Sequence, residues 1–229
     1  MRIAALGDRD PAHLTHREID ATLALLGDEV SCEWVPTDSA QAREPDAFDG
    51  IWLLPGTPYR DDDAARSAIR HCLDAGTPFL GTCGGFQYAC VELARSLAGV
   101  SGATSAELDP GGEALVVAPL ACALYGERRT VTPVRGTRLA AICGTEPFEG
   151  HHQCGYGLAA AYEAVLAGAG VVISAHAPDA GVEGIELPGH PFFMATAFQP
   201  QVGSSRSGAV HPLIAALLDA AAVRLQPQA

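Results

Sequence analysis

Length, composition and charge exclude several classes of protein before any motif is considered. The chain has 229 residues, with 14 Lys and Arg against 27 Asp and Glu, so that its formal net charge is −13. This charge argues against a nucleic-acid backbone or an anionic membrane as a partner. The sequence contains no lysine, which excludes a P-loop lysine and a Schiff-base lysine. The length suits one domain, and we expect residues 1–229 to form it.

Cysteine usage and hydropathy indicate the compartment. The seven cysteines are odd in number and lack disulfide-like spacing, which favours a reducing environment. The apolar start runs directly into Asp8-Arg9-Asp10, so that no signal peptide is predicted. No apolar run is long enough to span a bilayer. We expect a soluble, cytoplasmic protein.

The first half of the chain alternates apolar strands with amphipathic helices. Strands are predicted at 3–6, 30–35, 51–54 and 78–80, and helices at about 12–26, from 61 to 76 and from 86 to 97. A polar loop covers 36–45, and the four residues from Pro55 to Pro58 form a strong turn signal. This alternation predicts an α/β fold, a doubly wound and mainly parallel sheet with helices on both faces.

The second half is less regular. Short strands are predicted at 114–117, 129–134, 139–142 and 171–174, and helices at 159–167 and from 212 to 225. Residues 182–187 and 192–198 read as a strand pair joined by a Pro-Gly-His-Pro turn. No internal repeat and no linker marks a second domain.

A reactive side chain flanked by glycines follows the strand predicted at 78–80. The segment Gly81-Thr82-Cys83-Gly84-Gly85 separates this strand from the next helix. Such an elbow crowds the backbone, so that small neighbours are needed, and it lifts the central side chain out of the sheet edge. The positive end of the helix would lower the pKa of a cysteine there. We predict that Cys83 is a nucleophile; a buried structural cysteine is the alternative.

Three predicted turns collect at the carboxyl edge of the sheet, where open α/β sheets bind ligands. They are the turn at Gly56-Thr57, the elbow, and the strand end at residues 199–201. The N–H of Gly84 directly follows the nucleophile, and the Gly56-Thr57 backbone would supply a second donor, since Pro58 has no N–H. We predict an oxyanion hole formed by Gly56, Thr57 and Gly84, although a tight turn would by itself explain Gly56.

Two adjacent histidines invite a metal-site interpretation that we do not favour. His151 and His152 lie close in sequence to Cys154 and Cys143. Adjacent residues on a strand point in different directions, so that joint ligation would need an irregular backbone. No G-x-G-x-x-G follows a strand, and a dinucleotide site is therefore not indicated. We expect neither a metal nor another cofactor.

Several segments together resemble the class I glutamine amidotransferases, most closely the glutaminase domain of CTP synthase. The resemblance runs nearly end to end and is carried by residues 53–56, 81–87, 91–96, 169–174, 178–179, 182–183, 185–187 and 190–196. It implies the family's flavodoxin-like core, Cys83 as nucleophile, and Gln87 and Glu107 as residues lining the substrate pocket. No segment of the sequence resembles the synthetase domain that binds UTP and ATP, and we expect none. The resemblance therefore implies a stand-alone relative of the CTP synthase C-terminal region, with a possible role in pyrimidine metabolism.

The sequence departs from this family at the catalytic base. The family's strand ends in Phe-His-Pro-Glu, which supplies the base and its orienting carboxylate, whereas this one ends in Phe198-Gln199-Pro200-Gln201. Gln199 and Gln201 thus occupy the triad positions of His and Glu. An amide can neither take a proton from the thiol nor protonate departing ammonia, and each of these roles is typically worth about 10²–10⁴-fold in rate.

The segment that binds the glutamine α-carboxylate is also changed. The family's Arg-Tyr clamp has its counterpart in Gln153-Cys154-Gly155-Tyr156, which contains no arginine to read a carboxylate. Tyr156 is expected to remain at the substrate pocket, and Glu107 could hold a cationic group. His151 or His152 is the candidate for a replacement base.

Three functions remain open from the sequence. The first is a cysteine-dependent hydrolase or acyl-transfer enzyme acting on a small molecule other than free glutamine. The second is a non-catalytic relative that binds a metabolite or regulates a partner enzyme. The third is a glutaminase subunit that feeds ammonia to a separate synthetase. A homodimer is possible in each case.

Overall fold

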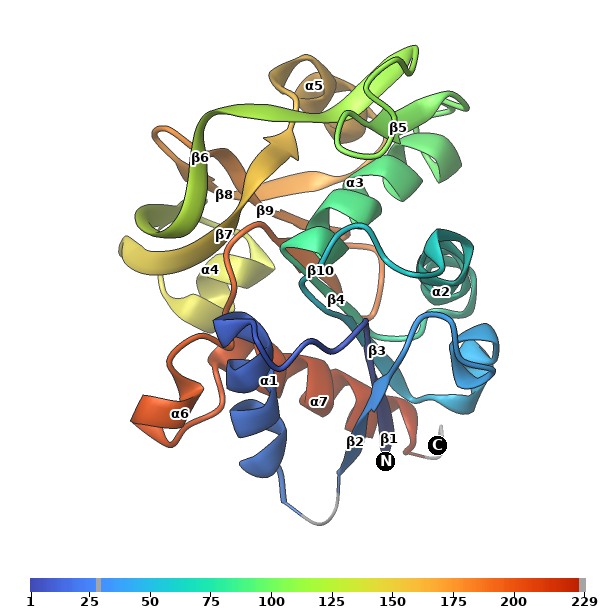
Figure 1. Cartoon of the computed structure of the whole chain (residues 1–229), viewed down its shortest axis with the longest axis vertical. Helices are drawn as coiled ribbons and strands as arrows, with labels where there is room; N and C mark the ends of the chain where they lie inside the picture. The colour runs from blue at the N-terminus through green and yellow to red at the C-terminus, as the bar shows by residue number, and fades with distance from the viewer. Residues whose placement is uncertain (28–29, 227–229) are drawn as a thin grey trace.

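The computed structural model describes residues 1–27 and 30–226 (Figure 1). In the first half, strands and helices alternate as predicted. The strands are β1 (Arg2–Leu6), β2 (Ser31–Val35), β3 (Gly50–Leu53) and β4 (Phe79–Thr82). The helices are α1 (Leu14–Ala24), α2 (Asp62–Ala75) and α3 (Gly84–Ser96). The predicted polar loop at 36–45 contains the short 3-10 turn Gln41–Arg43, and a second one follows at Pro45–Ala47.

The second half contains longer strands than the sequence predicts. Its strands are β5 (Ala103–Ser105), β6 (Ala114–Pro133), β7 (Phe148–Leu158), β8 (Val172–Ala177), β9 (Gly181–Glu186) and β10 (Phe193–Thr196). Its helices are α4 (Arg138–Cys143), α5 (Ala160–Gly168), α6 (Ser204–Ser207) and α7 (Pro212–Arg224). The strand pair and the final helix that the sequence predicts correspond to β9, β10 and α7.

The strands of the described residues form one sheet in the order β2-β1-β3-β4-β10-β9-β8-β6-β5, with β7 paired to β6. From β2 to β10 all neighbours are parallel. Beyond β10 the pairing is antiparallel through β9, β8 and β6. The carboxyl ends of β1, β3, β4 and β10 therefore meet at one edge of the sheet.

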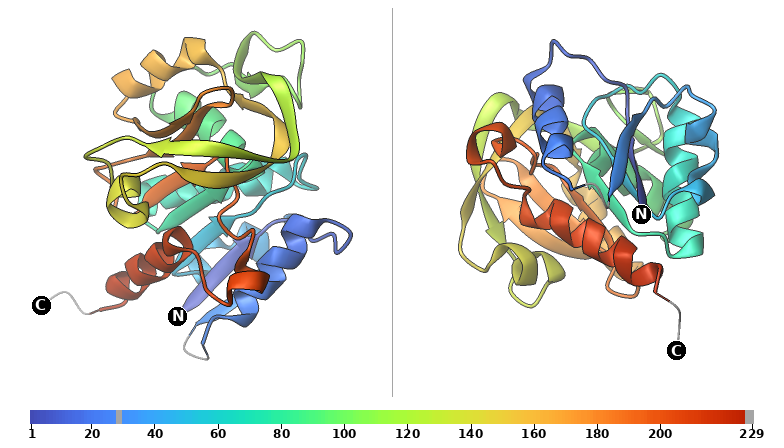
Figure 2. Two further views of the ribbon diagram at one scale, coloured as in Figure 1. Left: turned by 90° about the vertical axis from the view of Figure 1, so that its left-hand side faces the viewer. Right: turned by 90° about the horizontal axis from the view of Figure 1, so that it is seen from below.

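Both faces of the parallel half are covered, as the uninterrupted apolar strands predict. Successive residues of β3 enter opposite cores: Ile51 and Leu53 pack with α2 and α3, whereas Trp52 packs with α1 and α7. Figure 2 shows α7 crossing the sheet on the side opposite α2 and α3. The α/β fold with helices on both faces is confirmed.

One strand predicted in the second half was wrong, and two others proved to be parts of a single longer strand. Residues 139–142 form part of helix α4 rather than a strand, because Thr137 caps the helix by accepting a hydrogen bond from the Ala140 N–H. The segments predicted as strands at 114–117 and 129–134 belong to the single long strand β6. Their partner β7 was not predicted, since its sequence has no clean alternation of polar and apolar residues and contains three glycines, which are depleted in strands.

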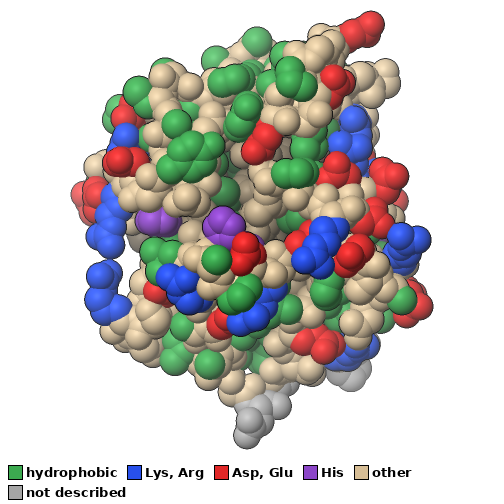
Figure 3. All heavy atoms as spheres, in the orientation of Figure 1, with side chains coloured by type: hydrophobic (Ala, Val, Ile, Leu, Met, Phe, Trp, Pro, Cys, Tyr) green, Lys and Arg blue, Asp and Glu red, His purple; other side chains and the backbone are tan. Residues whose placement is uncertain are grey.

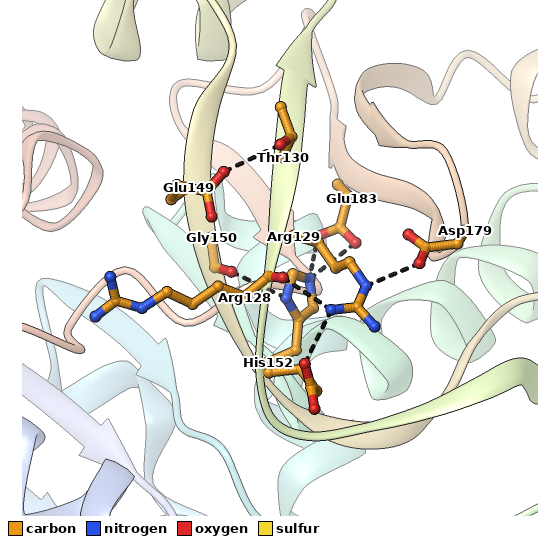
Figure 4. Close-up of polar contacts among 9 residues, drawn as sticks. Arg128, Arg129, Thr130, Glu149, Gly150, His152, Asp179 and Glu183 are labelled. Atoms are coloured by element: carbon orange, nitrogen blue, oxygen red, sulfur yellow. Dashed lines mark hydrogen bonds and ion pairs between the residues drawn. The ribbon is translucent and has the colours of Figure 1, made fainter.

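A buried ion pair ties β7 to β9 (Figure 4). His152 Nε2 lies 2.8 and 2.9 Å from the two carboxylate oxygens of Glu183, and its Nδ1 lies 3.1 Å from the Gly150 carbonyl oxygen. Both ring nitrogens face acceptors, so that both carry protons and the ring is cationic. Burial opposes this charge, but the hydrogen bond and charge of Glu183 outweigh it and raise the pKa of His152. Burial raises the pKa of Glu183 as well.

Within the described part of the chain, no helix has both the length and the apolar character needed to cross a membrane.

The close packing of the elbow glycines predicts that a side chain at Gly85 destabilises the fold. A Cβ on Gly85 would lie 2.2 Å from the Leu53 carbonyl oxygen, which backbone packing prevents from moving, whereas one on the helical Gly168 would meet nothing within 4 Å. Gly85→Ala should therefore destabilise the fold by about 1–3 kcal/mol or more, and Gly168→Ala should be neutral or slightly stabilising. Urea unfolding followed by circular dichroism measures both; equal midpoints would contradict the close packing of the elbow.

The buried ion pair of His152 and Glu183 leads to a second prediction about stability. His152→Gln leaves a buried carboxylate without its partner and should cost about 3–5 kcal/mol. Adding Glu183→Gln should recover part of this loss. Because folding raises the pKa of His152, its protonation contributes full stability below the unfolded value of about 6.5, and this contribution is lost as pH rises through the folded-state pKa. A double variant less stable than His152→Gln in urea would contradict the assignment.

Candidate functional site

The carboxyl edge of the sheet holds a cavity of about 260 Å³. Segments far apart in the sequence line it: the loop before α1, the turn after β3, the elbow, β7 and the end of β10. Figure 3 shows histidine side chains at the hollowed centre of this face of the molecule. Of the predicted site residues, the cavity is lined by Cys83, Gly56, Thr57, Glu107 and Gln199.

Cys83 occupies a strained elbow, as its flanking glycines predict. It is the one non-glycine residue of the described chain with positive φ, with φ 52° and ψ −104°. The Cys83 N–H donates to the Thr196 carbonyl oxygen at 2.8 Å, which fixes the elbow to β10. The residue immediately precedes α3, so that its side chain lies at the positive end of that helix. Strain of this kind is typical of functional positions.

The turn at Gly56-Thr57 lies directly against the elbow. A Cβ on Gly84 would lie 2.8 Å from both the Gly56 carbonyl oxygen and the Thr57 methyl group. Gly56 itself has φ +122°, a conformation that favours glycine. The Gly84 N–H donates to the Cys83 sulfur. The three residues predicted to form an oxyanion hole are thus neighbours around one sulfur atom.

A second thiol faces Cys83 in the cavity. Cys154, on β7, is hydrogen-bonded to Cys83, and this contact, followed by burial, raises the pKa of Cys83. The same hydrogen bond, together with the cationic His152, lowers the pKa of Cys154. The lowered pKa predicted for Cys83 is therefore wrong: the helix terminus acts as expected, but the neighbouring thiol is the more acidic of the pair.

Gln199 and Gln201 are buried beside the elbow and bonded to each other. Gln201 Nε2 donates to Gln199 Oε1 at 2.9 Å, and Gln201 is 0% exposed and Gln199 2%. This orientation leaves Gln199 Nε2, which belongs to a residue lining the cavity, without a hydrogen-bond partner. Gln201 Oε1 is likewise unpartnered. The amide pair thus offers the cavity a hydrogen-bond donor and no titratable group.

The predicted substrate-binding residues divide into two groups. Glu107 lines the cavity and accepts a hydrogen bond from the Thr57 hydroxyl at 2.8 Å. Gln87 and Tyr156 do not line it; instead, Gln87 Nε2 donates to the Tyr156 carbonyl oxygen at 3.4 Å and joins α3 to β7 behind the cavity. The structure therefore brings only Glu107 of this group to the cavity.

Neither histidine suggested as a replacement base contacts Cys83 in the described structure. His152 is fully buried, and both of its ring nitrogens are engaged. His151 lines a separate cavity with Arg128 and His211, and burial lowers its pKa. The geometry therefore gives neither ring access to the thiol.

Three residues that line the cavity were not predicted from the sequence. His13 and His16 belong to the connection between β1 and α1, and Tyr125 belongs to β6. His16 Nδ1 accepts from the Asp10 N–H at 2.9 Å and its Nε2 donates to the Pro55 carbonyl oxygen at 3.2 Å. Burial lowers the pKa of His16, so that the ring is neutral and braces the turn before Gly56. Because β1 ends at the same edge of the sheet, the sequence could have predicted that the loop after β1 reaches the cavity.

Within residues 1–27 and 30–226, no group of three or more His, Cys, Asp or Glu side chains is placed to hold a metal ion. All seven cysteines lie in these ranges, and all are free.

Comparison with known proteins identifies the family to which this chain belongs. The family model for class I glutamine amidotransferases matches residues 15–213. CTP synthase of Synechococcus sp. strain WH7803 is 37% identical over 223 residues, covering 88% of this chain and 40% of the relative. CTP synthase of Pyrobaculum aerophilum is 38% identical over 184 residues, covering 76% of this chain and 34% of the relative. The chain thus spans well under half the length of these curated relatives.

Solved structures agree in fold. The glutaminase domain of Trypanosoma brucei CTPS with bound acivicin superposes with a TM-score of 0.84 at 23% identity, covering 97% of this chain and 94% of that one. A glutamine amidotransferase from Thermotoga maritima superposes with a TM-score of 0.60 at 14% identity, covering 98% of this chain and 97% of that one. With the elbow cysteine, the sheet order and the family match in agreement, the chain belongs to the class I glutamine amidotransferases and is related to the glutaminase domain of CTP synthase.

Proposed function

We propose that the protein is a cysteine-dependent hydrolase or acyl-transfer enzyme that acts on an activated acyl group rather than on free glutamine. The main support for the proposal is that a strained nucleophile elbow is combined with two glutamines, Gln199 and Gln201, at the expected positions of the catalytic His and Glu. Cys83 keeps its strained backbone and its adjacent Gly84 amide. Gln199 and Gln201 offer only an amide donor where the family has a base and its orienting carboxylate.

The chemistry follows from these groups. The Cys83 sulfur attacks the acyl carbon of an ester or thioester while its proton passes to the Cys154 sulfur. The oxyanion then forms against the N–H groups of Gly84 and the Gly56-Thr57 turn. An alkoxide or thiolate of low basicity leaves and recovers the proton, and water or another acceptor cleaves the acyl-enzyme. Little help from a strong general acid is needed, in contrast to the departure of ammonia from an amide.

Charge in the cavity also argues against a free amino acid. No arginine is among the described residues that line it, whereas the Glu107 carboxylate is. A substrate carboxylate would therefore lack a bidentate partner and meet a like charge. The cavity suits a neutral acyl group or one with a cationic substituent near Glu107.

Two other functions have specific support. The CTP synthase relatives favour a glutaminase subunit that supplies ammonia to a separate synthetase. The replaced base favours a non-catalytic relative that binds a metabolite or regulates a partner. The strained elbow opposes this last function, because binding alone needs no strained thiol.

Ester hydrolysis distinguishes these functions. With p-nitrophenyl acetate, the wild-type protein should show turnover that Cys83→Ala lowers by at least about a hundredfold. Cys90→Ala, which removes a fully buried thiol elsewhere on α3, should leave the rate unchanged. Glutamine should give no ammonia above the rate of Cys83→Ala in a coupled assay. Cys83-dependent ammonia release would refute the exclusion of glutamine, and ester turnover independent of Cys83 would refute the nucleophile.

Restoring the family's residues tests the role of the amide pair. Gln199→His with Gln201→Glu should raise kcat for glutamine by about 10²–10⁴-fold over wild type, because it returns a base and its orienting carboxylate. KM should remain high, since the described cavity lining still lacks an arginine. Gln201→Glu alone is the matched control and should gain nothing. A folded double variant as slow as this control would show that the missing base is not what limits the reaction.

A further inference from the structure

The proposed acyl-transfer reaction uses the Cys83 sulfur as its nucleophile, whereas the Cys154 sulfur only accepts a proton. Both line the same cavity, and the two residues are 6% and 7% exposed. The Cys83 sulfur lies 4.0 Å from the carbonyl oxygen of Gln153, the residue directly before Cys154, and each thiol shifts the pKa of the other. Two thiols facing each other at the wall of a cavity can react with a small molecule that enters it and then with each other.

Rigid backbone holds each thiol in place. Cys83 is fixed by its elbow and by the hydrogen bond from its N–H to the Thr196 carbonyl oxygen. Cys154 lies on β7 opposite Leu124 of β6. The register of the β6–β7 pair shifts immediately beside this position, between Pro119 and Leu124 and again after Tyr125. Such irregularities commonly redirect a side chain beside an active site.

The other cysteines differ in setting. Cys72 and Cys90 are fully buried in the core, where burial raises the pKa of each above its ordinary value. Burial also raises the pKa of Cys143, to about 11. None of these three lines the cavity, and neither does Cys32 or the exposed Cys122. Only the pair combines cavity access with a second thiol in contact.

We propose that Cys83 and Cys154 form a disulfide when hydrogen peroxide enters this cavity, so that the pair is an oxidation site of the protein. In the first step the Cys154 thiolate attacks the peroxide oxygen, the O–O bond breaks, and the departing hydroxide takes a proton to become water. Cys154 is then a sulfenic acid. In the second step the Cys83 sulfur attacks the Cys154 sulfur, the S–O bond breaks, and the Cys83 proton leaves with the hydroxyl as a second water. Two thiols are oxidised by two electrons, and one peroxide is reduced.

Local charge supports the order of these steps. The cationic His152 and the hydrogen bond from Cys83 both favour the thiolate of Cys154. Sulfenic acids persist where no second thiol is near and condense rapidly where one is. The oxidised pair has no free nucleophile, and the disulfide would therefore also stop acyl transfer by Cys83.

Intact-protein mass spectrometry tests the proposal without any measurement of acyl transfer. The reduced protein is treated with one equivalent of hydrogen peroxide, blocked with N-ethylmaleimide and weighed. The expected product has lost two hydrogen atoms and carries two fewer maleimides than the reduced protein, and dithiothreitol reverses both changes. Fragmentation of the digested wild-type protein should locate the cross-link between Cys83 and Cys154.

Variants provide the matched controls. Cys154→Ser and Cys83→Ser should abolish the cross-link. Cys143→Ser should retain it, although Cys143 shares the tryptic segment of Cys154, and so should Cys72→Ser and Cys90→Ser, which alter the segment of Cys83. A wild-type protein that accumulates sulfinic acid without a cross-link, or a cross-link located at another pair, would overturn the proposal. Because fragmentation of the wild-type protein decides the location, misfolding of a variant does not affect the outcome.

Discussion

The close approach of the elbow to strand β3 is the constraint on which the site depends. Gly85 lies so near the Leu53 carbonyl oxygen that a Cβ there would be 2.2 Å from it, and Gly84 is likewise crowded by the Gly56-Thr57 turn. Without side chains at these positions, the start of α3 lies directly on the backbone of β3. This contact turns Cys83 into the cavity and brings the Gly84 amide and the Gly56 turn close to its sulfur. The strained φ of Cys83 is the cost of that geometry, which the hydrogen bond from its N–H to Thr196 of β10 helps to offset.

The side chains around the elbow are amides and thiols rather than the titratable base and carboxylate of an acid–base triad. Two buried amides, Gln199 and Gln201, are bonded to each other beside the elbow, and a second thiol, Cys154, lines the same cavity as Cys83. The buried ion pair of His152 and Glu183 supplies a positive charge that acts on Cys154 rather than on Cys83. As a result, the pKa of Cys154 is lowered while that of Cys83 is raised. Such a site favours reactions in which the leaving group or the oxidant needs little assistance from a general acid.

The parts of this arrangement that sequence could predict are those encoded locally. The four apolar strands of the first half, their helices and the elbow each depend on a few adjacent residues, and the glycines around Cys83 leave few alternatives. The long β6–β7 pair was not predicted, because its exposed and irregular strands carry no clean alternation. The short helix α4 was mistaken for a strand, since its Leu-Ala-Ala-Ile core fits either structure and the Thr137 cap decides. His16 was missed at the cavity because only the sheet order brings its segment to Cys83. The segment of Cys154 was expected at the substrate pocket, but the effect of its thiol on Cys83 was not. The contact with Cys154 also reversed the expected direction of the Cys83 pKa shift.

The central claim is that Cys83 accepts an acyl group without a conventional base, and the acyl-enzyme itself is the most direct evidence for it. Rapid acid quenching of the protein mixed with an acyl thioester, followed by mass spectrometry of its peptides, detects this species. The account predicts an acyl group on Cys83 within a single turnover, and no adduct at all with glutamine. An acyl group found on Cys154 or another residue, or a glutamyl adduct formed on Cys83, would contradict it.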